Sequence, residues 1–186
     1  MRRFLAIVPL ALLIVVGACT PTTPAAGTPT TAHSTTTVHP TTTVRPVTTT
    51  TAPSSSDWKT AMLTRINAER AAVGAAALQL CGRLTTAAQA HSADQAAHNL
   101  MTHTGSNGST FDQRIEAAGY LNWNALAENV AAGYTSVDAV MTGWMNSPGH
   151  RTNLLSTSYV HVGVGQATSA SGVIYWTQDF GRGGTC

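Results

Sequence analysis

The sequence carries little charge of either sign. Its 186 residues include 10 Lys and Arg against 8 Asp and Glu. We expect Arg2 and Arg3 to be removed with an N-terminal export signal, which leaves eight basic residues against eight acidic ones. A balance this close to neutrality excludes the basic surface of a nucleic-acid-binding protein. It equally excludes a polybasic patch for lipid headgroups, so any membrane association would come from acyl chains.

The sequence also lacks the familiar motifs of hydrolases. It contains no HExxH helix, which would present two histidines and a glutamate to zinc, and no GxSxG nucleophile elbow. None of its serines lies in a recognisable nucleophile motif. These absences weigh against an enzyme, although they leave other metal-assisted chemistry open.

Cysteine is scarce, with three residues in the whole chain. An odd number in an exported protein needs an explanation. Cys81 and Cys186 lie in the part expected to fold and can form a disulfide in an oxidising compartment. The loop that they close would stabilise the fold by about 4 to 5 kcal/mol as an upper figure. Cys19 is then the unpaired cysteine.

The N-terminus has the pattern of an export signal over residues 1–18. A short basic start precedes the apolar run FLAIVPLALLIVVGA, which is too short for a comfortable membrane span. The sequence VGAC at its end resembles a bacterial lipoprotein signal, in which Cys19 becomes the acylated first residue. The alternative is ordinary cleavage after Ala18. We therefore expect an exported protein that is anchored to the cell membrane through Cys19, or secreted if Cys19 is not acylated.

Residues 19–56 consist mainly of Thr, Pro, Ala and Ser. This segment has too little apolar surface to offset the entropy of ordering it, so we expect a disordered linker, and the tract is a compositional candidate for O-glycosylation. The folded domain then comprises residues 57–186, held away from the membrane by a stalk.

Hydrophobic periodicity predicts helices in the first part of this domain. Met62, Ile66, Glu69 and Val73 share one face of the first helix, and Gly74 ends it. In the second helix His91 and His98 share a face without a third ligand at matching spacing, which favours packed or half-exposed histidines. The further predicted helices are residues 111–119, residues 135–145 and a short helix from Ser147-Pro148 to Leu155.

The C-terminal part changes to a strand-like period of two. The run YVHVGVGQATSASGVIYWTQDFG alternates and has a turn signal at SASG, so we expect an antiparallel hairpin in which His161 is a surface or packed residue. ALAENVAAG or LQL could supply the further strand that a stable sheet needs. Helices followed by a late hairpin indicate an α+β domain.

Several blocks occur in an order that resembles the CAP superfamily (cysteine-rich secretory proteins, antigen 5 and pathogenesis-related 1) in its short bacterial form. The resemblance extends from Met62 to Phe180. Its blocks are INAERAAVGAAALQL, AAQAHS, MTHTGSNGSTFDQRIEAAGY, AENVAAGY, WMNSPGHRTNLL, YVHVGVG and YWTQDFG. It implies an α-β-α sandwich with a small antiparallel sheet flanked by helices.

The resemblance also implies a central cleft lined by histidines and acidic residues, where the histidines can hold a divalent metal such as zinc. The matching positions are His103 in MTH, Glu128 in AEN and His150 in PGH. Many family members have a second glutamate where this chain has Ser147. The acidic set is therefore incomplete. A smaller departure is Ala127, which stands where a glycine usually precedes the glutamate.

These three residues allow two chemical interpretations. His103 and His150 could bind a metal weakly, completed by Glu128 or water, because stable zinc sites usually have at least three protein ligands. Glu128 could then take a proton from a metal-bound water. In the structural interpretation, Glu128 is a buried carboxylate bonded to His103 or His150.

The expected function is a non-enzymatic protein of the bacterial cell envelope. The cleft would bind a small apolar or sterol-like lipid, a divalent metal or a cell-wall component. One alternative is a metal-dependent hydrolase of peptide or peptidoglycan, in which His103, Glu128 and His150 would be catalytic. The other is a structural or adhesive module, because a fold does not dictate a chemistry.

Overall fold

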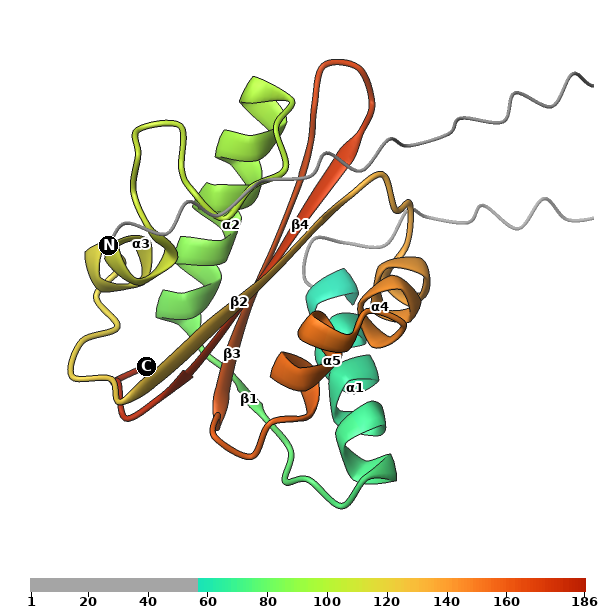
Figure 1. Cartoon of the computed structure of the whole chain (residues 1–186), viewed down its shortest axis with the longest axis vertical. Coiled ribbons are helices and arrows are strands. Elements are labelled where there is room, and N and C mark those ends of the chain that lie inside the picture. The colour runs from blue at the N-terminus through green and yellow to red at the C-terminus, as the bar shows by residue number, and fades with distance from the viewer. Residues whose placement is uncertain (1–56) are drawn as a thin grey trace, which may run out of the picture. The chain divides into compact units, whose positions relative to one another are not determined.

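The computed structural model describes residues 57–186. The predicted export signal, Cys19 and the linker lie outside the described residues. Along residues 57–186 the elements are α1 (Asp57–Ala72), β1 (Gln79–Leu80), α2 (Gly82–His98), α3 (Phe111–Ala117), β2 (Ala125–Ala132), α4 (Val137–Met145), α5 (Pro148–Leu155), β3 (His161–Thr168) and β4 (Ile174–Arg182) (Figure 1). Within this part of the chain no helix is long and apolar enough to span a bilayer.

The sheet has the strand order β1-β3-β4-β2. The predicted hairpin is present, since β3 pairs antiparallel with β4 from His161 opposite Gly181 to Thr168 opposite Ile174. Both segments considered for a further strand contribute one. The AENVAA segment forms β2, antiparallel to β4, and the LQL segment supplies the two-residue β1, which pairs in parallel with β3.

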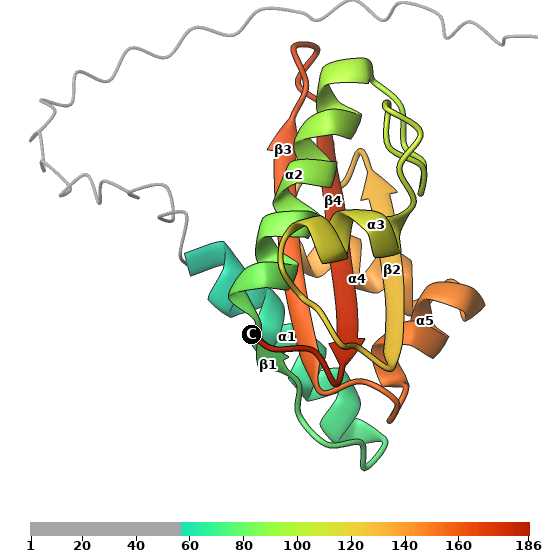
Figure 2. The same ribbon diagram turned by 90° about the vertical axis from the view of Figure 1, so that its left-hand side faces the viewer.

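Helices cover both faces of this sheet. In Figures 1 and 2, α2 and α3 lie on one face, whereas α1, α4 and α5 lie on the other. The arrangement is the α-β-α sandwich expected from the sequence. It buries an apolar layer on each side of the sheet, and the side chains of β2 and β4 alternate between the two layers.

The layer between the sheet and α1, α4 and α5 is the larger core. Met62 and Ile66 of α1 are fully buried there with Trp144 of α4. The prediction that Val73 continues this face is wrong, because the helix ends at Ala72 and Val73 is 53% exposed. Arg70 is instead the last buried residue of α1. Its guanidinium donates to the carbonyl oxygens of Ala76, Leu154 and Ser156 at 2.7–2.8 Å.

Helix α2 packs unusually close to β3. A Cβ at Gly163 would lie 2.0 Å from the carbonyl carbon of Leu84, and one at Gly165 would lie 2.2 Å from the carbonyl oxygen of Ala88. Only glycine permits this approach, since it lacks a Cβ. The alternation in YVHVGVG therefore places Val162 and Val164 in the larger core, and Gly163 and Gly165 under α2.

Side chains cover both edges of the sheet. The short β1 leaves part of the β3 edge uncovered. There the side-chain amide of Gln89 donates to the backbone carbonyl of Gln166 at 2.7 Å and accepts from the backbone N–H of Gln166 at 3.3 Å. On the opposite edge, the indole of Trp144 donates to the carbonyl of Val130, and Asn153 donates to the carbonyl of Glu128. These contacts satisfy backbone groups that an edge strand would leave unpaired.

A disulfide joins Cys81, directly before α2, to Cys186, the last residue. The Cα atoms are 5.2 Å apart, within the usual range for such a bond. Cys81 is fully buried beside Leu84, Ile115 and Tyr120 in the smaller core. The bond therefore holds the C-terminal segment against the α2 layer.

Candidate functional site

The site is built around Glu128 in the middle of β2. Its side chain is 1% exposed and projects toward the α2 and α3 layer. Two opposite groups bind its two oxygens: His103 Nδ1 lies 2.8 Å from Oε1, and Arg114 Nη2 lies 2.6 Å from Oε2. The carboxylate is thus fully engaged, as the structural interpretation of the sequence expects. A buried charge with two charge-assisted hydrogen bonds is compatible with burial, whereas an unpaired one is not.

His103 lies in the loop after α2, and its side chain is 56% exposed. The hydrogen bond to Glu128 raises the pKa of His103 above its ordinary value of 6.5, and it outweighs the opposing effect of burial. Because Nδ1 faces Glu128, Nε2 is the nitrogen that remains for a ligand.

Arg114 is a component of the site that the sequence analysis did not identify. Besides Glu128, it donates through Nη1 to the carbonyls of His103 at 3.1 Å and Ser109 at 2.9 Å. One guanidinium therefore anchors the 103–109 loop and compensates the buried carboxylate. In the sequence, FDQRIEA indicates only a short amphipathic helix, in which an arginine would be expected at the surface.

A second buried carboxyl, Asp179 of β4, lies directly opposite Glu128 in the sheet register. Desolvation, followed by the neighbouring charge of Glu128, raises the pKa of Asp179 well above its ordinary value of 3.8. Ionisation of Asp179 is therefore disfavoured, since a second charge beside a buried carboxylate is unfavourable. Its Oδ1 has no hydrogen-bond partner in the described part of the chain.

His150 approaches from the other side of β2. It lies in the first turn of α5, which Ser147 and Pro148 begin as predicted. Its Nδ1 is 2.9 Å from Ser147 Oγ, so the residue at the family's second glutamate position instead orients the imidazole through a hydroxyl. Burial, and then the charge of His103, lower the pKa of His150 below 6.5.

Asn129, the residue after Glu128, fixes the backbone of His150. Its amide donates to the His150 carbonyl at 3.1 Å and accepts from Asn153 at 2.9 Å. Successive residues of β2 thus serve opposite faces of the sheet. Glu128 holds His103 on one face, and Asn129 positions the helix of His150 on the other.

A cavity of about 250 Å³ adjoins His150. Its lining is mainly apolar and includes Met101, Val130, Tyr134 and Trp144. Its polar side chains are those of Ser147 and His150, together with the hydroxyl of Tyr134. The cavity therefore suits a mainly apolar ligand that carries a polar group.

The donor set does not suit a tightly bound zinc ion. Within residues 57–186 no group of three or more His, Cys, Asp or Glu is arranged to hold a metal. Glu128 is engaged by His103 and Arg114, which leaves His103 and His150 as two imidazole donors. Two protein ligands are fewer than stable zinc sites use, so only weak, exchangeable binding is chemically reasonable.

The other histidines of the domain have structural surroundings. His91 of α2 is buried, and its Nε2–H donates to the Thr102 carbonyl at 2.8 Å, in the tautomer that this contact requires. His98 is 55% exposed and contacts Asp94. His161 is half-buried, 2.9 Å from the hydroxyl of Tyr120, as expected for a packed strand residue.

The family model of cysteine-rich secretory proteins (CAP) matches residues 63–180. The chain belongs to the CAP family. Its CAP domain is 37% identical over 133 residues to the uncharacterized protein YkwD of Bacillus subtilis, covering 70% of this chain and 50% of that protein. It is 31% identical over 136 residues to the uncharacterized membrane protein YlbC of the same organism, covering 69% and 38%. The chain thus spans half the length or less of these curated relatives.

Two solved structures have a similar fold. An extracellular protein with an SCP domain from Bacillus anthracis has a TM-score of 0.58 at 26% identity, covering 68% of this chain and 42% of that one. An outer surface protein of Borrelia burgdorferi has a TM-score of 0.61 at 23% identity, covering 66% and 90%. At that identity the second match supports the fold alone.

Proposed function

We propose that this CAP-domain protein is an exported binding protein of the bacterial cell envelope, which holds a small apolar ligand in the cavity beside His150. The observation that carries the proposal is a mainly apolar lining that also contains the hydrogen-bonded pair of Ser147 and His150. Ligand sites typically combine apolar linings with few polar groups that fix orientation. The cavity volume of about 250 Å³ suits a small ligand or the end of a longer chain.

The state of His150 indicates which polar group the ligand carries. Because burial lowers its pKa, His150 is neutral at pH 7 and offers a hydrogen bond without a charge. A hydroxyl or other neutral polar group of the ligand matches the imidazole of His150 better than an ammonium does. Glu128 has a structural role beside this cavity, because one oxygen accepts from His103 and the other from Arg114.

A titration of the purified chain with 1-octanol, followed by ¹H–¹⁵N NMR, tests this proposal. We expect shifts concentrated at Met101, His150 and the neighbouring part of β2. Met101→Trp at the rim should weaken binding about fivefold or more by obstructing the cavity. Leu121→Trp is the matched control, because both residues are 51% exposed and Leu121 lies outside the cavity lining. Shifts scattered over the surface, or equal affinity in both variants, would reject the cavity as the site.

A divalent ion is proposed as a weak additional ligand of His103 and His150. In such a complex the ion would supply Lewis acidity to a ligand bound beside these two histidines. Zinc titrated into the purified chain should shift the ring signals of both histidines, and His103→Ala with His150→Ala should abolish these shifts. His98→Ala, at an exposed histidine outside the site, should not. Undiminished zinc binding in the double variant would assign the ion elsewhere.

Membrane anchoring through an acylated Cys19 is part of the same proposal. It is supported by the sequence VGAC and by the disulfide between Cys81 and Cys186, which leaves Cys19 as the remaining cysteine. Cys19→Ala should move the protein from the membrane fraction to the soluble fraction of producing cells. Unchanged retention in the membrane fraction would contradict a lipid anchor and leave the cavity proposal intact.

A further inference from the structure

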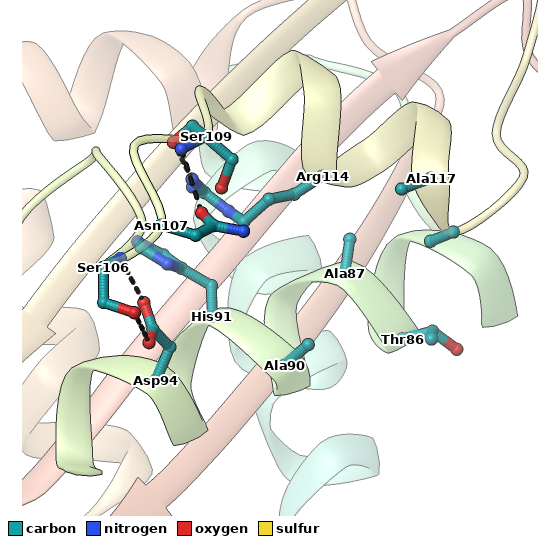
Figure 3. A pocket seen from close by; sticks show the side chains of 11 residues that line it. Thr86, Ala87, Ala90, His91, Asp94, Ser106, Asn107, Ser109, Arg114 and Ala117 are labelled. Carbon is teal, nitrogen blue, oxygen red and sulfur yellow. Dashed lines mark hydrogen bonds between the residues drawn. The ribbon is translucent and has the colours of Figure 1, made fainter.

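A second and larger cavity, of about 420 Å³, lies on the opposite face of the sheet from the α4 and α5 helices. Helices α2 and α3 and the loop between them enclose it (Figure 3). Ala87 and Ala90 of α2 and Ala117 and Ala118 of the α3 segment form its apolar walls. Its polar residues are Thr86, His91, Asp94, Ser106, Asn107, Ser109 and Arg114.

Two charged side chains line this cavity, and one of them is already compensated. Arg114 donates to the buried carboxylate of Glu128 at 2.6 Å and to two carbonyl oxygens. Asp94, in contrast, has no Lys or Arg partner in the described part of the chain. The cavity lining therefore has the uncompensated charge of a single carboxylate, which favours a cationic occupant.

Asp94 is held in place for this role. The backbone N–H of Ser106 donates to its Oδ2 at 2.8 Å, and the Ser106 hydroxyl donates to Oδ1. These hydrogen bonds lower the pKa of Asp94, so its carboxylate stays ionised. A carboxylate has about four lone-pair sites, and acceptance from Ser106 occupies two of them. The imidazole of the exposed His98, 3.2 Å from Oδ1, approaches from outside the cavity lining.

His91 makes the cavity compatible with a cation. Burial lowers its pKa, so the ring carries no charge that would repel one. Since Nε2–H donates to the Thr102 carbonyl, Nδ1 carries a lone pair, and this buried atom has no hydrogen-bond partner within residues 57–186. Further acceptor oxygens come from Asn107 and from the hydroxyls of Ser106 and Ser109, which line the cavity.

We propose that this cavity is a binding site for a primary ammonium group carried on a short aliphatic chain. The ammonium group donates its three N–H bonds to Asp94 and to the oxygens of the 106–109 loop, while the aliphatic chain lies against the alanines of α2 and α3. The site is separate from the cavity of the proposed function, because it lies on the other face of the sheet and shares no lining residue with it. The same chemistry occurs in a free alkylamine and in the lysine side chain of a peptide.

A ¹H–¹⁵N NMR titration of the purified full chain at pH 8 with n-butylammonium tests the proposal. We expect saturable shifts at Ala87, Ala90, Asp94 and the 106–109 loop. 1-Butanol, which has nearly the same size without the charge, should bind at least about tenfold more weakly. The peptide acetyl-Ala-Lys-Ala-amide is the second arm. Binding of either amine supports the site and identifies the source, whereas binding of neither refutes it.

Two variants and one control separate recognition from folding. Asp94→Asn should weaken butylammonium binding about tenfold or more through loss of the charge. Ala90→Leu should abolish binding by filling the cavity, and it should fold normally because Ala90 is an exposed helical position and leucine is a good helix former. Asp138→Asn removes the same charge from α4, on the other face, and should leave binding unchanged. Butylammonium affinity retained in Ala90→Leu, or equal affinity for 1-butanol, overturns the proposal.

Discussion

Replacing Arg114 by leucine removes the cation that compensates Glu128. The Glu128 side chain is 1% exposed and that of Arg114 is 12% exposed, so water cannot take over this role. Breaking a buried ion pair at one partner typically costs about 3–5 kcal/mol, because the other charge remains buried. We expect a loss in this range in the free energy of unfolding, measured by urea denaturation at pH 7.

The matched control is Arg65→Leu. Arg65 pairs with Glu69 one helical turn away, but its side chain is 35% exposed, and such pairs contribute only about 0.3–0.5 kcal/mol. The double variant Arg114→Leu with Glu128→Leu should lose less stability than Arg114→Leu alone, since both charges disappear together. If Arg114→Leu costs no more than Arg65→Leu, the inference that Arg114 compensates a desolvated carboxylate is refuted.

The disulfide, the glycines under α2 and the two site histidines each give a further prediction. Changing Cys81 and Cys186 to serine should lower the free energy of unfolding by up to about 4–5 kcal/mol, and a reducing agent should then have no further effect; an unchanged free energy of unfolding in the double variant would contradict this. Gly163→Ala should cost about 1–3 kcal/mol or more, because its Cβ meets the backbone of α2, and an unchanged melting temperature would exclude the close packing. In an NMR titration the His103 ring should titrate above pH 6.5 and the His150 ring below it. The contribution of His103 to the free energy of unfolding is then present below pH 6.5 and is lost as the pH rises through its folded pKa. The contribution of His150 is lost as the pH falls below 6.5. The reverse titration order would contradict the bond between His103 and Glu128 and the burial of His150.

The sequence predicted those features that depend on local chemistry or on a recognisable order of motifs. The Ser147-Pro148 start of α5 follows from capping preferences, and the hairpin follows from alternation around SASG. The α-β-α sandwich follows from the family resemblance. The failure at Val73 is also local in origin, because periodicity alone cannot tell at which residue a helix stops contributing to the core.

The environment of Glu128 could not be predicted in the same way. Asp179 reaches it only through the register of β2 against β4, and Arg114 only through the path of the 103–109 loop. Neither pairing leaves a spacing signal in the sequence, since 51 residues separate one pair and 14 the other. The sequence indicated a contact between a histidine and Glu128, but the positions of Arg114 and Asp179 beside it depend on tertiary structure.

The side-chain amide of Gln89 hinders the association of two molecules through their sheet edges. A β-strand from a second molecule could extend the sheet past β3 only by first displacing the two hydrogen bonds between Gln89 and Gln166. On the far side, Trp144 and Asn153 similarly occupy carbonyls of β2. Molecules at high local concentration would therefore contact one another without joining their sheets into a continuous ribbon.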